Sequence, residues 1–380
     1  MELYIHIPYC RQKCRYCDFA SYAGRESTMA RYVDALLSEA RHMASYAHGT
    51  PIETVFIGGG TPSLLPPDLL RRLLNGLRQQ YLLPRGIEFT SEANPGTLTR
   101  EWLDVAIEGG VNRISMGMQA SHESLLRTLG RIHTFEQVKE SVELVRAAGI
   151  SNISLDLMFG LPGQTVEMWR ETMLAALSLQ PAHISAYGLI PEEGTPLTHD
   201  LDAGRLTLPH EEDERRMYDD AIQLLAKHGL QQYEISNFAR PGHACRHNIG
   251  YWRQVPYIGL GASAASMLLS DAGCIRTSNP SSIENYIHMI DTTQWDLREE
   301  TRISRDDMRF ETLMLGLRMT QGVSEAEFEN MHGVTLEAYR GKKLRSLEYQ
   351  GLLVHESGWW RLTRKGMDVQ NSILVDLMDE

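Results

Sequence analysis

The sequence predicts an α/β fold in which six parallel strands alternate with helices and are followed by a smaller helical module. Three observations predict it: short runs of β-branched and apolar residues recur up to about residue 230, segments of helical periodicity lie between them, and polar or glycine-rich motifs follow the strands. Such alternation is typical of a parallel sheet with right-handed crossovers. An open six-unit barrel and a flat doubly wound sheet both fit it.

Each expected strand is short and is followed by a longer helical segment. The strands are 3–7, 54–57, 87–93, 112–118, 152–158 and 183–190. The helices, chosen by the spacing of their apolar residues, are 29–45, 68–80, 101–108, 136–148, 166–179 and 211–228. Thr134 and Gln137 form a capping box ahead of the fourth of these helices. The polar motifs fall at the carboxyl ends of strands, where barrel active sites are built, and this favours the barrel.

The composition indicates an ordinary globular chain of two to three domains, with 42% hydrophobic and 23% charged residues among 380. The start of the sequence has no basic stretch before an apolar core, so no signal peptide is expected. Five cysteines, an odd number, point to a reducing cytoplasm. The net charge of -12 argues against a general polyanion binder, because nucleic-acid affinity depends on neutralising phosphates.

Three cysteines lie close together near the start of the sequence, at Cys10, Cys14 and Cys17. Thiolates at spacings of four and three on one short loop can hold three irons of a four-iron, four-sulfur cube. Iron–sulfur clusters normally have four cysteine ligands, so a triplet without a fourth partner nearby leaves one iron open to a small molecule. Tyr16 and the apolar flank of the loop would shield such a cluster.

Two other interpretations of the cysteines are weaker. A thioredoxin-like pair would use Cys14 and Cys17 but would not explain Cys10, and it belongs to a shorter domain. A zinc site would need a second pair of ligands. The candidates for that pair lie more than two hundred residues away, at His243, Cys245, His247 and Cys274.

Polar residues follow successive strands at the same edge of the expected sheet. Gly58-Gly-Gly-Thr-Pro-Ser63 follows the second strand, where glycines allow a close approach of the backbone to a ligand. This run lacks the spacing of a dinucleotide fingerprint and the lysine of a phosphate-binding loop. The other polar residues at this edge are Glu92, Gln119, Arg131 and Asp156. Together they predict a polar pocket over the cysteine loop.

These motifs, in this order, resemble the radical S-adenosylmethionine (SAM) family that contains oxygen-independent coproporphyrinogen III oxidase and a haem chaperone branch. The resemblance is carried by the cysteine triplet and by residues 4–8, 58–62, 92–95, 112–117, 156–162 and 258–262. It implies a radical SAM partial (β/α)6 barrel with a [4Fe-4S] cluster on Cys10, Cys14 and Cys17. It also implies SAM contacts at Tyr4, Tyr16, Gly59, Gly60, Thr61, Glu92, Gln119, Arg131 and Asp156. In this family, one-electron reduction of the bound sulfonium gives methionine and a 5′-deoxyadenosyl radical, and the cofactor supplies that reactivity.

Two departures from the oxidase pattern indicate the haem chaperone branch. The oxidase carries a further cysteine where this sequence has Phe19, and the segment His247-Asn-Ile-Gly-Tyr-Trp252 matches a motif of the chaperone branch. His247 could ligate haem iron, while Tyr251 and Trp252 offer flat faces to a porphyrin. By itself, a histidine before two aromatics is more often a hydrogen-bonded structural group. Cys245 is an alternative thiolate ligand, although a buried structural thiol is the more common role.

The segment from 301 to 380 reads as a separate module. A helix over 304–318, a second from the capping box at Ser324 and Glu327, and a third over 336–349 precede a hairpin of 352–354 and 359–362 and a final helix. This order is typical of a winged helix. From Thr301 to Glu380 there are 11 Lys and Arg against 13 Asp and Glu, a net of -2, which is poor support for DNA binding. A lid or partner-docking module is expected instead.

The sequence therefore predicts a cytoplasmic haem chaperone with three parts. These are a partial barrel over 1–230, a connecting segment with the haem motif over 231–300, and a C-terminal winged-helix-like module over 301–380. The expected cofactors and ligands are a [4Fe-4S] cluster, SAM and haem, and the expected partner is a haem-acceptor protein. The alternative is an enzyme that oxidatively decarboxylates coproporphyrinogen III. The acceptor's identity, dimerisation, membrane association through the acceptor, and SAM cleavage in the normal cycle stay open.

Overall fold

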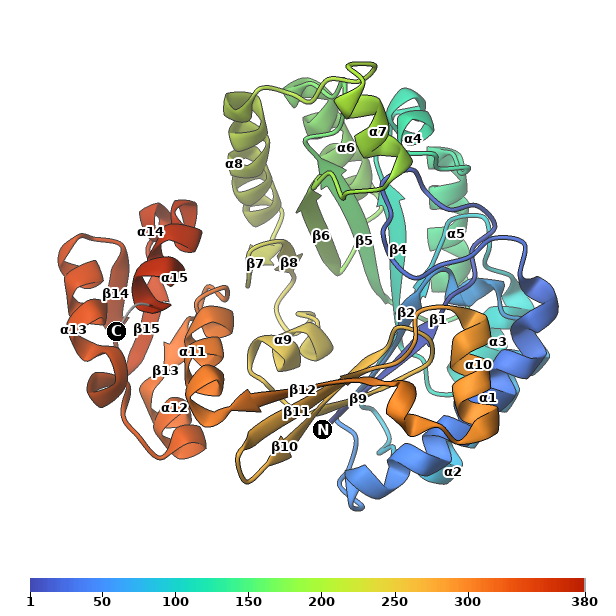
Figure 1. Cartoon of the computed structure of the whole chain (residues 1–380). Coiled ribbons are helices and arrows are strands. Elements are labelled where there is room, and N and C mark those ends of the chain that lie inside the picture. Colours follow the sequence, from blue (N-terminus) through green and yellow to red (C-terminus); the bar gives the residue numbers. More distant parts are fainter. Residues whose placement is uncertain (379–380) are drawn as a thin grey trace.

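The computed structural model describes residues 1–378, which form a large curved sheet covered by helices and a smaller C-terminal module beside it (Figure 1). The large sheet has the strand order β12-β11-β10-β9-β1-β2-β3-β4-β5-β6-β8-β7. The module has its own three-stranded sheet of order β13-β15-β14.

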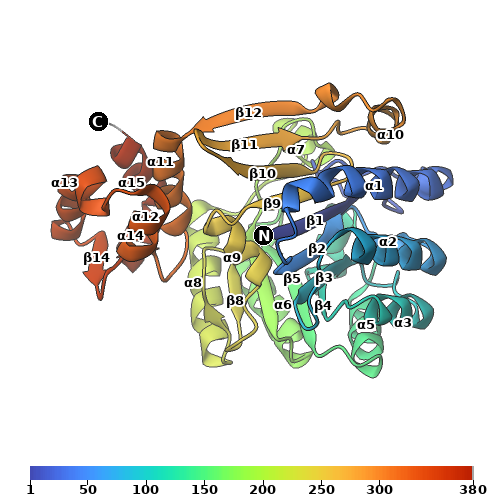
Figure 2. The ribbon, with the colours of Figure 1, turned by 90° about the horizontal axis from the view of Figure 1, so that it is seen from below.

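The first six strands are parallel, and the predicted alternation of strands and helices is confirmed. The strands are β1 (Glu2–Ile7), β2 (Thr54–Gly59), β3 (Glu88–Ala93), β4 (Arg113–Gln119), β5 (Asn152–Phe159) and β6 (His183–Gly188). The main helices between them are α1 (Met29–Met43), α2 (Pro67–Gln80), α3 (Arg100–Glu108), α5 (Phe135–Ala147) and α6 (Val166–Ser178), and α8 (Glu211–Lys227) follows β6. They cover the outer face of the curved sheet, as Figure 2 shows. This is the partial six-unit barrel.

Two short helices were not predicted, α4 (Glu123–Thr128) and α7 (Pro196–Asp202). Each spans about two turns at most, because an α-helix needs 3.6 residues per turn, and so short a segment shows little apolar periodicity. Both pack around the mouth of the barrel. Leu125, Leu126 and Leu197 share a small apolar cluster there.

Buried apolar side chains hold the strands and helices together. Leu3, Ile5 and Ile7 of β1 are fully buried, and α2 buries a stripe of leucines at Leu70 and Leu74 against the barrel. Burying apolar side chains of this size contributes roughly 1.5–3 kcal/mol each. The capping box of Thr134 and Gln137 at the start of α5 is confirmed, with both reciprocal hydrogen bonds present. Among residues 1–378, no helix is both long and apolar enough to span a bilayer.

The segment predicted as a connection over 231–300 is instead largely part of the main sheet. Its elements are β7 (Gln231–Gln232), β8 (Asn237–Ala239), α9 (Arg246–Trp252), β9 (Tyr257–Leu260), β10 (Ala265–Ser270), β11 (Gly273–Ser278) and α10 (Ile283–Thr292), followed by β12 (Glu299–Ser304). β8 pairs with β6 at one edge, and β9 pairs with β1 at the other. β7, β8 and β9 span four residues or fewer, and β8 and β9 pair with distant strands, so local patterning did not reveal them. β10 and β11 form an adjacent hairpin that the sequence analysis missed. The helix α9 joins these two edges and packs against β2.

The C-terminal module begins directly after β12. It contains α11 (Arg305–Gly316), β13 (Val323–Ser324), α12 (Glu325–His332), α13 (Leu336–Tyr349), β14 (Leu353–Glu356), β15 (Trp359–Leu362), α14 (Arg364–Asp368) and α15 (Gln370–Met378). Three helices followed by a hairpin match the predicted winged-helix-like order. Leu313, Leu317 and Phe328 belong to a core of the module's own. α11 also packs against α9, so the module touches the segment that carries the predicted haem motif.

Candidate functional site

The three cysteines line one cavity of about 370 Å3 at the carboxyl ends of the barrel strands. We call it the cysteine cavity. Its walls include Cys10, Cys14, Tyr16, Cys17, Phe19, Gly59, Gly60, Glu92, Asn94, Ser115, Gly117, Gln119, Arg131, Asp156, Met158 and Tyr187. These residues come from the loop after β1, from the ends of β2 to β6 and, for Arg131, from the segment after α4. The cavity therefore lies where the barrel architecture places active sites.

The cysteine loop is fixed to the mouth of the barrel by backbone and side-chain contacts. The amide of Cys10 donates to the carbonyl of Tyr22 at 3.0 Å, and the amide of Arg15 donates to the carbonyl of Leu129 at 2.9 Å. The Arg15 guanidinium also pairs with Asp200, near the end of α7. All three cysteines are free thiols and are partly exposed. The three sulfurs of the loop therefore line the cavity and are not buried in the hydrophobic core.

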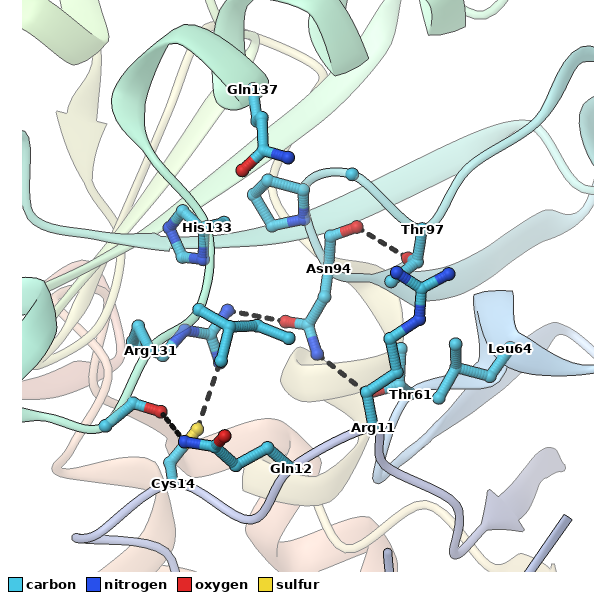
Figure 3. A pocket seen from close by; sticks show the side chains of 14 residues that line it. Arg11, Gln12, Cys14, Thr61, Leu64, Asn94, Thr97, Arg131, His133 and Gln137 are labelled. Atoms are coloured by element: carbon cyan, nitrogen blue, oxygen red, sulfur yellow. Dashed lines mark hydrogen bonds between the residues drawn. The ribbon is translucent and has the colours of Figure 1, made fainter. Parts of the chain in front are cut away.

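A chain of hydrogen-bond donors reaches two of these sulfurs. Arg131 donates to the Sγ of Cys14 at 3.3 Å, and Thr61 donates to the Sγ of Cys10 at 3.6 Å. Asn94 links the two donors, because its Oδ1 accepts from Arg131 at 2.6 Å and its Nδ2 donates to Thr61 at 2.7 Å (Figure 3). Hydrogen bonds to sulfur tune iron–sulfur clusters. The surroundings of the thiols therefore fit a cluster.

Burial raises the pKa of the Cys10 thiol and of the Cys17 thiol, which favours the protonated form of these two sulfurs. A coordinated metal displaces such protons outright. In residues 1–378, no three His, Cys, Asp or Glu side chains are placed to hold a single metal ion, either here or around the distant candidate zinc ligands. A preformed zinc site is therefore absent from the described chain.

Two half-buried carboxyls, Glu92 and Asp156, line the cavity together with the cysteine loop. Glu92 accepts from the backbone amide of Gly59 at 3.0 Å, and burial, together with the nearby charge of Asp156, raises the pKa of Glu92 to about 8. Burial also raises the pKa of Asp156, although Ser115 and Ser185 donate to it at 3.2 and 2.8 Å. Carboxyls held in this way suit hydroxyl and ammonium groups, which SAM carries on its ribose and its amino acid.

The glycines after β2 are needed for packing as well as for access to a ligand. Gly59 has φ of 111°, a conformation that other residues rarely adopt. A Cβ at Gly60 would lie 2.6 Å from the carbonyl oxygen of Tyr9, at the start of the cysteine loop. The glycine run therefore allows the loop to lie directly on the end of β2.

The residues predicted to contact SAM line the cysteine cavity, except for Tyr4 and Thr61. Thr61 contacts Cys10 instead, and the Tyr4 hydroxyl lies 3.0 Å from the Nδ1 of His6. Their roles in binding SAM stay predictions. Sequence reasoning missed Asn94 and Ser115, although both lie inside the quoted motifs at strand ends. Their position at strand ends could have identified them, because the carboxyl ends of all the parallel strands meet at the same edge of the sheet.

The predicted haem ligand His247 is buried, with 1% of its surface exposed. Its Nδ1 lies 2.7 Å from the hydroxyl of Thr54, and its Nε2 lies 3.0 Å from the hydroxyl of Tyr251. Its ring stacks on Phe56 at 5.3 Å between centroids. Burial lowers the pKa of His247 to about 3, so the imidazole is neutral. Both ring nitrogens are engaged within the protein.

The helix α9, which carries His247, is held against the barrel strands by contacts with Glu88 of β3 and Glu2 of β1. The carboxylate of Glu88 accepts from the amides of Arg246 and His247 at 2.9 and 3.1 Å, at the helix N-terminus. Cys245 is fully buried, with its Sγ 3.5 Å from Glu88. A Cβ at Gly250 would lie 1.9 Å from the carboxylate of Glu2, so this helix needs a glycine at its contact with β1.

Two further cavities lie between the cysteine cavity and the C-terminal module. A polar chamber of about 220 Å3 shares Glu92, Ser115, Asp156 and Tyr187 with the cysteine cavity and is bounded elsewhere by His247 and Tyr251. A third cavity of about 500 Å3, which we call the aromatic cavity, shares Tyr4 and Tyr251 with this chamber. The predicted SAM residues and the predicted haem motif are thus neighbours across the barrel interior.

Comparison with known proteins agrees with this architecture. Residues 4–176 match the model of the radical SAM superfamily, and residues 303–369 match the HemN C-terminal domain. The coproporphyrinogen III oxidase HemN from Escherichia coli has a similar structure, with a TM-score of 0.84, 24% identity, and coverage of 99% of this chain and 89% of that chain. At this identity, the likeness shows the fold alone.

Relatives of higher identity extend over the whole chain. A Bacillus subtilis protein named heme chaperone HemW is 37% identical over 99% of each chain. The Escherichia coli protein of that name is 36% identical over 98% of this chain and 97% of its own length. A zebrafish protein, radical S-adenosyl methionine domain-containing protein 1, mitochondrial, is 32% identical over 100% of this chain and 87% of its own.

The barrel, the cysteine loop and these matches define a radical SAM protein. The superfamily implies a [4Fe-4S] cluster and SAM, and the thiols and donors of the cysteine cavity fit that pair. Within this superfamily, the chain belongs to the HemW family.

Proposed function

We propose that this protein binds haem and passes it to an acceptor protein, and that it carries a SAM-coordinated [4Fe-4S] cluster on Cys10, Cys14 and Cys17. The observation that carries the proposal is full-length similarity, at 37% identity, to a protein named heme chaperone HemW, combined with the motif of His247, Tyr251 and Trp252. Haem is then the cargo. The cluster and SAM are resident groups.

The cysteine cavity supports the resident part of this proposal. Three partly exposed thiols face Glu92 and Asp156 across the cavity. Arg131 and Thr61 would stabilise the thiolates, and the carboxyls would orient SAM at the open iron. When bound, this pair supplies one-electron chemistry. The protein's own share is to hold the groups in place and to limit the access of water.

An oxidase that acts on coproporphyrinogen III is the second candidate, because the fold is shared with such an enzyme. Phe19 argues against it, since this position carries a cysteine in the oxidase pattern, whereas here an aromatic ring with 62% of its surface exposed lies on the cavity wall. The chaperone proposal explains both Phe19 and the motif on α9. The oxidase explains neither.

One experiment on one sample separates the two functions. After anaerobic reconstitution of the cluster, the protein is titrated with haem and assayed for conversion of coproporphyrinogen III with SAM and a reductant. We expect about one haem bound per chain and no conversion, and we expect a haem-depleted acceptor to gain haem from the loaded protein. Conversion of coproporphyrinogen without haem binding would favour the oxidase.

Binding of SAM is tested separately. The substitution Asp156→Asn removes a half-buried carboxylate while keeping the side-chain volume, and Ser115 and Ser185 can still contact the amide. We expect weaker binding of SAM to the reconstituted protein, measured by the change in the electron paramagnetic resonance spectrum of the reduced cluster. Glu167→Gln, at the start of α6 and outside the residues of the cavity wall, is the matched control.

A further inference from the structure

The aromatic cavity has one wall from the barrel and one from the C-terminal module. It is lined by Tyr4, Tyr251, Trp252, Gln254, Tyr257, Ala265, Met267, Arg276, Glu311, Met314 and Leu315. Its volume, about 500 Å3, lies within the roughly 300–1,000 Å3 typical of sites for small molecules. Four aromatic rings, two thioethers and a single ion pair give it the character of a site for a flat, largely apolar ligand.

The two ends of the motif on α9 face this cavity differently. Tyr251 and Trp252 line it, whereas His247 does not and lines the polar chamber behind Tyr251. His247 also has both nitrogens hydrogen-bonded, to Thr54 at 2.7 Å and to Tyr251 at 3.0 Å. A planar ligand in the aromatic cavity would therefore meet the phenol of Tyr251 before it could reach the imidazole.

We propose that the phenolic oxygen of Tyr251 is the ligand of the haem iron and that His247 is a positioning residue behind it. This inference rests on the proposed function, since it names the atom that holds the cargo. Tyrosine is a known axial ligand of haem iron. One oxygen–iron bond forms and the phenol O–H bond breaks. The phenol proton is released to solvent, the Nε2 of His247 holds the oxygen in place from 3.0 Å, and the oxidation state of the ferric iron does not change.

The rest of the cavity suits the other parts of haem. Tyr257 lies edge-on to Tyr251, with 4.7 Å between ring centroids, so the two rings form one aromatic wall. Met267 and Met314 add polarisable side chains, which adapt to flat aromatic surfaces. Arg276 pairs with Glu311 at 2.5 Å, and a haem propionate would compete with that carboxylate for the guanidinium.

The C-terminal module thereby becomes part of the haem site. Glu311, Met314 and Leu315 lie on α11, on the side of the helix that faces the cavity, whereas Leu313 and Leu317 of this segment pack into the module's own core. Loading and release of haem would then depend on the packing of α11 against α9.

The test uses the full-length, cluster-loaded protein, ferric haem and four variants. Tyr251→Phe removes the proposed ligand, and Tyr257→Phe removes a neighbouring phenol of the same cavity as the matched control. Tyr251→His replaces the ligand type. His247→Gln keeps a hydrogen-bonding side chain behind Tyr251. Each sample is titrated with haem and its ferric complex is examined by resonance Raman and electron paramagnetic resonance spectroscopy, while iron and sulfide content and thermal unfolding report on folding.

We expect the parent and Tyr257→Phe to show tyrosinate-ligated ferric haem. Tyr251→Phe should lose that signature and bind haem about tenfold or more weakly, a difference of about 1.4 kcal/mol or more. Tyr251→His should show a histidine-type spectrum, which a purely structural role of Tyr251 would not produce. His247→Gln should keep the tyrosinate signature with a shifted band, because only the hydrogen bond to the ligand changes.

Two results would overturn the assignment while leaving the proposed function intact. One is a histidine-type parent spectrum that persists in Tyr251→Phe and disappears in His247→Gln. The other is a tyrosinate signature lost in Tyr257→Phe but kept in Tyr251→Phe. A parent protein that binds no haem at all would instead overturn the proposed function itself. The three outcomes are distinguishable on the same set of samples.

Discussion

The guanidinium of Arg131 lies 3.3 Å from the Sγ of Cys14 and also donates to the carbonyl of Gly117 at 2.7 Å and to Asn94 at 2.6 Å. The side chain that follows α4 is therefore fixed between the end of β4 and the cysteine loop. A half-buried cation beside a sulfur stabilises the thiolate and the more negative state of any cluster bound there. The first prediction follows from this contact.

Replacing Arg131 by Gln should lower the reduction potential of the reconstituted cluster. The substitution removes a positive charge next to Cys14, and the reduced, more negative cluster loses more stabilisation than the oxidised one. The measurement is a redox titration followed by electron paramagnetic resonance. Arg127→Gln, on the exposed face of α4 where the guanidinium pairs with Glu123, is the control and should leave the potential unchanged. Equal potentials in all three proteins would contradict the assigned role.

Each of Cys10, Cys14 and Cys17 should be indispensable for the cluster. Reconstituted parent protein should contain about four irons per chain, and replacing any one of the three by Ala should abolish retention, because two thiolates cannot hold the cube. Cys274 is the control, since its thiol is buried between β10 and α11, away from the loop. Chemical determination of iron and sulfide measures the outcome. Retention in Cys10→Ala together with loss in Cys274→Ala would show that the cluster lies elsewhere.

The substitution Gly60→Ala should disturb the cysteine loop rather than only narrow the cavity. The new Cβ would lie 2.6 Å from the backbone oxygen of Tyr9, so one of the two segments must shift. We expect reduced cluster content and a lower unfolding temperature, both measured on the reconstituted protein. Gly188→Ala is the control, because Gly188, like Gly60, lies outside the left-handed region and its new Cβ would come no closer than 3.3 Å to another atom. If Gly60→Ala retains the cluster as the parent does, the contact tolerates a side chain.

The stability of the protein should depend on pH through Glu2, at the contact with α9. Burial raises the pKa of Glu2 from 4.5 to about 8, and its Oε2 has no hydrogen-bond partner in residues 1–378. Between these values the folded protein keeps a proton that the unfolded chain has released. The contribution of Glu2 is therefore fully present below about pH 4.5 and is lost as the pH rises through about 8.

Glu2→Gln should remove this dependence. Relative to the parent, the variant should gain free energy of unfolding between pH 5 and pH 8, with a slope of at most about 1.4 kcal/mol per pH unit for one proton. Denaturant unfolding of the metal-free protein at several pH values measures the difference. Glu53→Gln is the matched control, because its side chain is 58% exposed and pairs with the N-terminal amine. A difference that does not vary with pH would contradict the raised pKa.

Local patterning was enough to predict the barrel helices and the capping box at Thr134. Their amphipathic spacing reports burial directly, and the capping residues are adjacent in sequence. The same holds for the cysteine loop, whose ligand spacing lies within eight residues. The sequence also showed that Phe19 occupies the position of a cysteine in the oxidase pattern.

Only the tertiary structure decided where the remaining parts lie. Residues 231–304 extend the sheet at both edges because β8 pairs with β6 and β9 pairs with β1, and such distant pairing leaves no local period in the sequence. Asn94, after β3, links Thr61, after β2, to Arg131, which follows α4. The burial of His247 behind Tyr251 depends on Glu88 and Thr54, more than 150 residues earlier in the chain. The sequence by itself determined which chemical groups are present and which local elements carry them. The long-range packing alone decided which of those groups face a cavity, because burial and hydrogen bonding are set by neighbours that are distant along the chain.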